Sequence, residues 1–135
     1  MNFFIYSLPR SGSAWLSQFL TGPDSYCYHE PFSDDLGVRQ KCTESIIGAV
    51  DTSAFQFHKG AHIEMGAKPY VLVRDPSEVA FSLAKLGVVA DTHAMRQELD
   101  ALGIPDVIEH QHFGSMDYLE AVSYTHLTLP TIYSV

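Results

Sequence analysis

The chain has 135 residues, of which 46% are hydrophobic, and this length suits one domain around a single hydrophobic core. The formal net charge of −8 at pH 7 argues against nucleic acid or an anionic membrane surface as partner, because both require a basic stripe. No apolar run is long enough to span a membrane, and the N-terminal segment reaches Pro9 too early for a signal peptide, so a cytoplasmic protein is expected.

Apolar periodicity and turn residues predict alternating strands and helices along the chain. Gly22-Pro23, Gly87 and Gly103 each stop a helical pattern, and Asp75 followed by Pro76 forms a helix start. In chain order we expect strand 2–7, helix 13–20, strand 25–29, a helical turn from Thr43, strand 46–50, strand 68–73, helix 76–86, helix 92–102, strand 106–112 and helix 115–122.

This alternation predicts an α/β fold, an open and mainly parallel sheet with helices on both faces, in the manner of a P-loop NTPase-like three-layer sandwich. Residues 1–122 are expected to form the one domain. Residues 123–135 follow neither a helical nor a strand period and carry no charge. They closely resemble the conceptual translation of a sequencing adapter, a frequent scar in metagenomic fragments, so we expect the natural protein to continue past about Val122 and this chain to be truncated there.

Three charged residues directly follow predicted strands. Arg10 follows the first strand, Glu30 the second, and Arg74 the strand over 68–73. In an open parallel sheet the ligand lies outside the carboxyl ends of the strands. These three side chains are therefore expected to meet at one edge of the sheet.

The turn Pro9-Arg10-Ser11-Gly12-Ser13 has the composition of an anion-binding loop. Gly12 permits backbone angles that are closed to other residues, and small neighbours let backbone N–H groups approach an anion. The helix that begins near Ser13 directs its free N–H groups to the same place, and Arg10 adds a cation. The loop lacks the G-x-x-x-x-G-K-[ST] pattern of nucleoside triphosphate-binding P-loops.

Two segments resemble motifs of the sulfotransferase superfamily. The run PRSGSAWL at 9–16 is similar to the family's 5′-phosphosulfate loop, P-[KR]-[ST]-G-[ST]-x-W. The run VLVRDPSEVAFS at 71–82 is similar to its 3′-phosphate motif, in which an Arg at a strand end and a Ser eight residues later bind the phosphate. Arg74 and Ser82 have this spacing.

The resemblance implies 3′-phosphoadenosine-5′-phosphosulfate (PAPS) as co-substrate and in-line transfer of its sulfuryl group to a hydroxyl or amine of a small-molecule or carbohydrate acceptor, without a metal. It assigns Arg74 and Ser82 to the 3′-phosphate and Arg10 to the charge on the leaving oxygen. The residues that it places around the 5′-phosphosulfate are Arg10, Ser11, Gly12, Ser13, Ala14 and Trp15.

A general base has to accept the proton of the acceptor. His29 and Glu30 end the second strand, and carbohydrate- and tyrosine-directed sulfotransferases resemble this chain in having a Glu-containing segment there. Glu30 is favoured over His29. Strand alternation places Tyr28 and Glu30 on one side and Cys27 and His29 on the other, so one of the pair is expected to face the site.

The remaining candidates carry less specific signals. Trp15 is expected in the core, with a ligand-stacking ring as the alternative. Asp51 and Ser53 are candidates for the acceptor pocket, and Cys27 and Cys42 match no metal motif and are expected to be free thiols. Two histidine pairs have spacings that metal ligands also show, but with no third ligand identifiable a solvent-facing or locally hydrogen-bonded position is favoured for both: His58 with His62, and His110 with His112.

Two other functions remain open. The loop is compatible with a kinase-like phosphotransferase, although it lacks the lysine and no magnesium-binding acid is evident at a strand end. A non-catalytic nucleotide-binding protein, including a fragment too short to turn over, is the third reading. The acceptor and the oligomeric state do not follow from the sequence.

Overall fold

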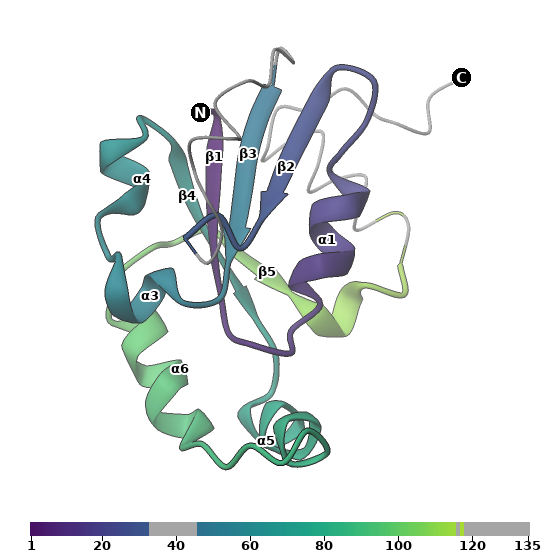
Figure 1. Ribbon diagram of the computed structural model, residues 1–135, viewed down its shortest axis with the longest axis vertical. Helices are drawn as coiled ribbons and strands as arrows, with labels where there is room; N and C mark the ends of the chain where they lie inside the picture. The colour runs from purple at the N-terminus through teal and green to yellow at the C-terminus, as the bar shows by residue number, and fades with distance from the viewer. Residues whose placement is uncertain (33–45, 116, 118–135) are drawn as a thin grey trace.

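The computed structural model describes residues 1–32, 46–115 and 117 (Figure 1). The expected turn from Thr43, nearly all of the expected helix over 115–122, Cys42 and the tail over 123–135 lie outside these residues. The elements in chain order are β1 (Phe3–Ser7), α1 (Ser13–Phe19), β2 (Ser25–His29), β3 (Ile46–Asp51), α3 (Ala54–Phe57), α4 (Ala61–Glu64), β4 (Lys68–Val73), α5 (Pro76–Ala84), α6 (Thr92–Asp100), β5 (Val107–Glu109) and the 3₁₀ turn η1 (His110–His112).

The five strands form one sheet in the order β2-β3-β1-β4-β5, and every pair is parallel. The expected open parallel α/β fold is therefore confirmed. The order differs from the dinucleotide-binding order 3-2-1-4-5 and from the flavodoxin-like order 2-1-3-4-5, because β3 lies between β1 and β2. Gly48 in β3 pairs with Phe3, whose ring covers the glycine so closely that it occupies the space of a Cβ.

Helices cover both faces of the sheet, which gives three layers (Figure 1). On one face, Leu16 and Phe19 of α1 pack on Phe3 and Ile5 of β1. On the other face lie α3, α4, α5 and α6, and the core residues there are Phe4, Tyr6, Leu8, Tyr28, Ala49, Ala54, Phe55, Ala61, Ala67, Val71, Val73, Val79, Leu83 and Leu99. Alternate residues of β1 thus enter opposite cores, and this makes β1 the central strand of the fold.

Most expected elements agree with the structure to within two residues at each end, and the exceptions are local. The strand expected over 106–112 ends at Glu109, where η1 begins. The short helices α3 and α4 were not expected, because four residues are too few to show a helical period. None of the described helices is both long enough and apolar enough to cross a membrane.

Two backbone N–H groups on the outer edge of β2 form hydrogen bonds with the segment that precedes the strand. The N–H of Glu30 donates inward to the carbonyl of Val50 at 2.9 Å. The N–H of Cys27 instead donates to Oγ1 of Thr21 at 3.1 Å, and that of Ser25 to the carbonyl of Gly22 at 3.5 Å. Since alternate N–H groups of a strand point to opposite sides, these two face away from β3.

Candidate anion-binding site

The loop after β1 turns sharply at the carboxyl end of the sheet. Arg10 has φ 59° and Gly12 has φ 85°, both in the left-handed region. The carbonyl of Gly12 accepts the first helical bond of α1 from Leu16 N–H at 2.9 Å. Ser11 is fully buried within this turn, and its Oγ has no hydrogen-bond partner among the residues that the structure describes. A buried hydroxyl without a partner is unusual in a folded protein and marks the loop as a place where a ligand or water would be favourable.

Gly12 is required by its neighbours as well as by its backbone angle. A Cβ at this position would lie 2.7 Å from Cε2 of Phe113 and 3.3 Å from Cδ2 of His110. Both residues come from the segment after β5, so that segment packs directly on the loop. Burial lowers the pKa of His110, and the nearby Arg74 guanidinium lowers it further. Both effects favour the neutral form of the His110 imidazole beside the cations of the site.

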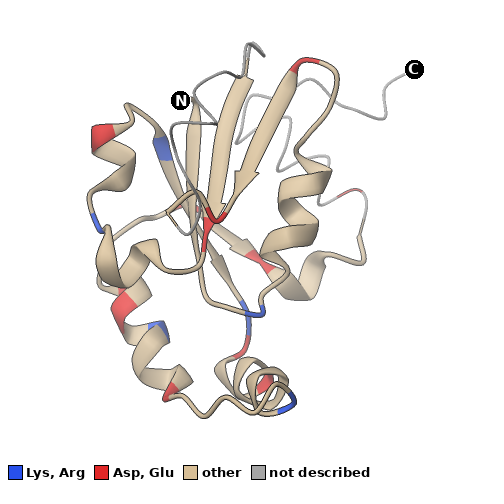
Figure 2. Cartoon of the chain, viewed as in Figure 1, with Lys and Arg blue, Asp and Glu red and all other residues tan. Residues whose placement is uncertain are grey.

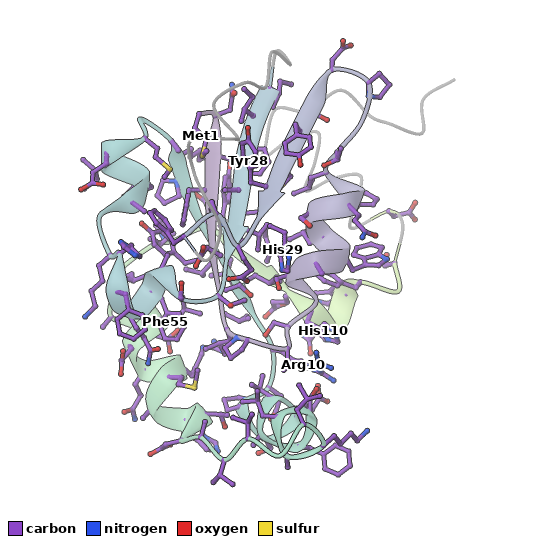
Figure 3. All side chains as sticks on the ribbon, viewed as in Figure 1. Met1, Arg10, Tyr28, His29, Phe55 and His110 are labelled. Atoms are coloured by element: carbon purple, nitrogen blue, oxygen red, sulfur yellow. The ribbon has the colours of Figure 1, made fainter. Side chains whose placement is uncertain are left out.

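The two segments expected to hold anions meet through Arg10. Its Nε donates to Oγ of Ser82 at 2.9 Å, and Arg74 Nη1 donates to the Arg10 carbonyl at 2.8 Å. These bonds connect residues that are 64 and 72 positions apart in the sequence. Figure 3 shows Arg10, His29 and His110 near one end of the sheet, whereas Met1 lies at the other. The side chain of Arg10 is turned toward Ser82, and because it is exposed it has room to reorient.

The start of α5 holds Arg74 in place. The Asp75 carboxylate accepts from the N–H of Ser77 at 2.8 Å and caps the helix, as expected, with Pro76 in its first turn. Arg74 Nε donates to Oε2 of Glu78 at 3.1 Å, one turn into the helix. Figure 2 shows the resulting mixture of basic and acidic positions where β4 meets α5.

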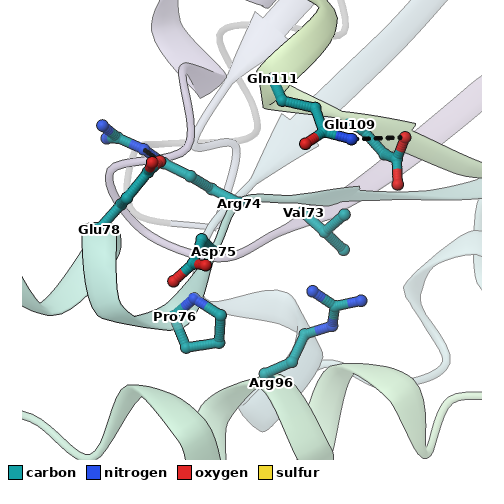
Figure 4. A pocket seen from close by; sticks show the side chains of 8 residues that line it. All are labelled: Val73, Arg74, Asp75, Pro76, Glu78, Arg96, Glu109 and Gln111. Atoms are coloured by element: carbon teal, nitrogen blue, oxygen red, sulfur yellow. Dashed lines mark hydrogen bonds and ion pairs between the residues drawn. The ribbon is translucent and has the colours of Figure 1, made fainter.

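Within the described part of the chain, Arg74 lines hollows on two sides of the start of α5. One, of about 380 Å³, lies on the outer face of α5 and is lined by Arg74, Ser77, Glu78, Phe81, Ser82 and Lys85. The other, of about 320 Å³, lies between the start of α5, α6 and the end of β5 and is lined by Val73, Arg74, Asp75, Pro76, Glu78, Arg96, Glu109 and Gln111 (Figure 4). The first contains both residues expected to bind one phosphate, Arg74 and Ser82.

His29 and Glu30 lie next to the loop. His29 Nε2 is 3.1 Å from Oγ of Ser13, the first residue of α1, and 3.5 Å from Oε1 of Glu30. The Glu30 carboxylate also accepts from the N–H of Thr52 at 3.1 and 3.2 Å. Strand alternation holds up to His29, but Glu30 has φ 57°, so the two side chains approach each other instead of lying on opposite faces.

Asp51 ends β3 at the same edge of the sheet, and it is fully buried. Its Oδ1 accepts from Ser53 N–H, Ser53 Oγ and Ala54 N–H at 2.7 to 2.9 Å, and its Oδ2 accepts from Phe32 N–H at 3.1 Å. The carboxylate therefore fastens the start of α3 to the sheet. The expectation that Asp51 lines an acceptor pocket does not match this buried, bonded position.

Trp15 does not belong to the core. Its side chain lies on the rim of α1, 43% exposed, and its ring stacks on Phe19 with centroids 5.3 Å apart and lies 5.1 Å from Phe113. The expectation of a core position is wrong, because the face that α1 turns to the sheet is centred on Leu16. Ala14 is exposed beside it.

The histidines at metal-ligand spacing have local partners. The His62 ring is 2.7 Å from the hydroxyl of Tyr6, the His58 ring stacks on Phe32, and His112 lies 2.9 Å from Glu109. Within the described ranges, no three His, Cys, Asp or Glu side chains form a group that could hold a metal. Cys27 is a free and buried thiol, whose pKa is raised by burial.

Three residues of the site were not among the candidates from sequence, namely Glu78, Lys85 and Phe113, and His110 was considered only for its metal-ligand spacing with His112. Glu78 and Lys85 follow Arg74 and Ser82 at helical spacing on the same face of α5, and this spacing is a usable signal in the sequence. His110 and Phe113 carry no such signal, because their contact with Gly12 depends on the path of the chain after β5.

Comparison with known proteins supports the fold class only. No protein-family model matches the chain, and no curated protein matches it. Among solved structures, the tunicamycin resistance protein of Deinococcus radiodurans is similar, with a TM-score of 0.58 over 96% of this chain and 99% of that one. The identity is 13%, so the similarity concerns the α/β architecture alone, which is compatible with a P-loop-like fold.

Proposed function

We propose that this chain is the donor-binding domain of a PAPS-dependent sulfotransferase. The observation that carries the proposal is the junction of the loop after β1 with α5, made by Arg10 on Ser82 and by Arg74 on the Arg10 carbonyl. PAPS carries two anionic groups on one ribose, so it needs two adjacent anion sites. The loop and the outer face of α5 supply two such sites with a shared arginine between them.

The reaction would be an in-line displacement at sulfur. The bond from sulfur to the 5′-phosphate oxygen breaks while a bond forms to the acceptor oxygen, and the acceptor proton passes to a base. Arg10 is assigned to the charge that develops on the leaving oxygen, after its exposed side chain turns from Ser82 toward the loop. Glu30 is assigned as the base, and His29, which contacts both Glu30 and Ser13, is the second candidate.

A kinase-like phosphotransferase is the alternative, since the same fold and loop suit it. Phosphoryl transfer from a nucleoside triphosphate generally uses magnesium held by an acidic residue, and Asp51 stands at a suitable strand end. The four hydrogen bonds that Asp51 accepts and its complete burial oppose this role. A sulfuryl group carries less charge than a phosphoryl group, and its transfer therefore fits a site without a magnesium-binding acid among its described residues better than phosphoryl transfer does.

Binding of 3′,5′-adenosine bisphosphate, the desulfated product, tests the proposal by calorimetry. Arg74→Ala is expected to raise the Kd roughly 10- to 100-fold, because a charge-assisted hydrogen bond contributes about 1.5–3 kcal/mol. Lys68→Ala is the matched control, since it removes one positive charge at the other end of the same strand. No affinity for the nucleotide, or an affinity that Arg74→Ala leaves unchanged, would refute the donor site.

Activity assays distinguish the proposed sulfotransferase from the alternative phosphotransferase. With PAPS and a panel of hydroxyl and amine acceptors, small molecules and carbohydrates, we expect sulfate transfer that does not require magnesium. Magnesium-dependent transfer or hydrolysis of ATP would favour the phosphotransferase instead. Binding without either activity would favour the non-catalytic reading.

A further inference from the structure

The outer face of α5 is rich in cationic groups for a chain with a net charge of −8. The hollow of about 380 Å³ on this face is lined by Arg74 and Lys85 together with the hydroxyl groups of Ser77 and Ser82. Arg10 reaches the same place through its bond to Ser82. Three of the eight Lys and Arg residues of the chain thus gather around one small hollow.

The carboxylate of Glu78 lines this hollow and forms an ion pair with Arg74. The carboxylate accepts from Arg74 Nε at 3.1 Å, and the Glu78 side chain is 59% exposed while that of Arg74 is 25% exposed. Figure 4 shows the two side chains directed toward each other above the start of α5. An exposed pair at this helical spacing contributes little to stability, so it breaks readily when a stronger anion arrives.

Lys85 lies one turn beyond Ser82 on the same face. Its Nζ stands 4.6 Å from the centroid of the Phe81 ring, a cation–π contact that holds the ammonium group against the helix. No other acidic side chain lines this hollow besides Glu78, as far as the described residues go. Lys85 is therefore positioned to meet an anion that replaces Glu78 on Arg74.

We propose that Glu78 is a built-in competitor of the 3′-phosphate for Arg74, and that Lys85 is a further cation of that phosphate site. This inference rests on the proposed function. A phosphate monoester carries nearly two negative charges and three acceptor oxygens, so it displaces a single carboxylate, whereas a neutral 3′-hydroxyl does not. The site thereby distinguishes nucleotides by the charge of their 3′ substituent.

The competition also affects product release. Donor and desulfated product carry the same 3′-phosphate and make the same contacts with Arg74, so a tighter site would retain the product. Glu78 weakens the grip on both and returns to Arg74 as the nucleotide leaves. Glu78 thus lowers the affinity for the nucleotide and speeds its release, whereas Lys85 raises the affinity.

Two variants, each measured with two nucleotides, test the inference. Glu78→Gln is expected to lower the Kd of 3′,5′-adenosine bisphosphate about two- to fivefold and to slow its dissociation by a similar factor, because the competing charge is gone. Lys85→Met is expected to raise that Kd roughly three- to tenfold. Neither change should alter the Kd of adenosine 5′-monophosphate, which has a 3′-hydroxyl, by more than about twofold.

Glu64→Gln is the matched control for charge, because it removes one exposed carboxylate on α4, and it should leave both affinities unchanged. Glu78→Asp, whose shorter side chain keeps the charge, should behave closer to the unmodified protein than Glu78→Gln does. Unchanged or weaker binding in Glu78→Gln, with binding still dependent on Arg74, overturns the inference and leaves the donor site standing. Loss of Arg74-dependent binding altogether overturns the proposed function instead.

Discussion

Replacing Gly12 by alanine perturbs the loop in two separable ways. The φ of 85° lies in the left-handed region, where a residue with a Cβ costs about 1–2 kcal/mol. The new Cβ would also lie 2.7 Å from Cε2 of Phe113, an overlap of the kind that costs about 1–3 kcal/mol in a packed site. Together these effects predict that Gly12→Ala lowers the free energy of unfolding by about 2–5 kcal/mol.

A double-mutant cycle separates the contributions of backbone strain and overlap. Urea denaturation is measured for the unmodified protein, Gly12→Ala, Phe113→Ala and the double variant. In a Phe113→Ala background the overlap with the Phe113 ring is absent, so Gly12→Ala should cost mainly the backbone strain, with the contact to Cδ2 of His110 at 3.3 Å remaining. The difference between backgrounds should be about 1 kcal/mol or more. Gly66→Ala is a control for strain alone, because Gly66 has φ 62° and open space where its Cβ would stand. A loss below about 0.5 kcal/mol for Gly12→Ala, or equal losses in the two backgrounds, would refute the packing of Phe113 on the loop.

Three further predictions concern Asp51, Gly48 and His110. Asp51→Ala leaves four donors without their acceptor and should destabilise the fold by about 3 kcal/mol or more in the same assay. Gly48→Ala should cost about 1–3 kcal/mol, restored in part by Phe3→Leu, since the Phe3 ring covers Gly48. The folded-state pKa of His110 is lowered, so the unfolded chain binds more protons and stability should fall as the pH drops below the usual histidine pKa of about 6.5. His110→Asn should reduce this loss in denaturation series between about pH 5 and 7, and an unchanged pH slope would count against it.

The fold could be predicted from local signals because the strands are short apolar runs ended by strong turn residues. The cap formed by Asp75 and Pro76 and the strand over 68–73 agree with the structure for this reason. The position of β3 between β1 and β2 could not be predicted, because apolar periodicity does not specify which strands pair. The same limit applies to η1, whose three residues His110 to His112 have no distinctive period.

The candidate site was predictable in its parts and less so in its arrangement. The spacing of Arg74 and Ser82 indicated one anion site, and both residues line one hollow. The bond from Arg10 to Ser82 depends on the left-handed backbone of Arg10, and no residue preference forecasts such an angle for arginine. Trp15 was misplaced because helical spacing identifies a broad apolar face without locating its rim.

The hydrogen bonds along the outer edge of β2 have a consequence for self-association. An open strand edge is a template on which a strand of another molecule can add, which is a common route to aggregation. Thr21 accepts the outward N–H of Cys27, and Gly22 that of Ser25, so two donors that an added strand would need are already occupied. Thr21 and Gly22 thereby oppose intermolecular β-pairing along this stretch of β2.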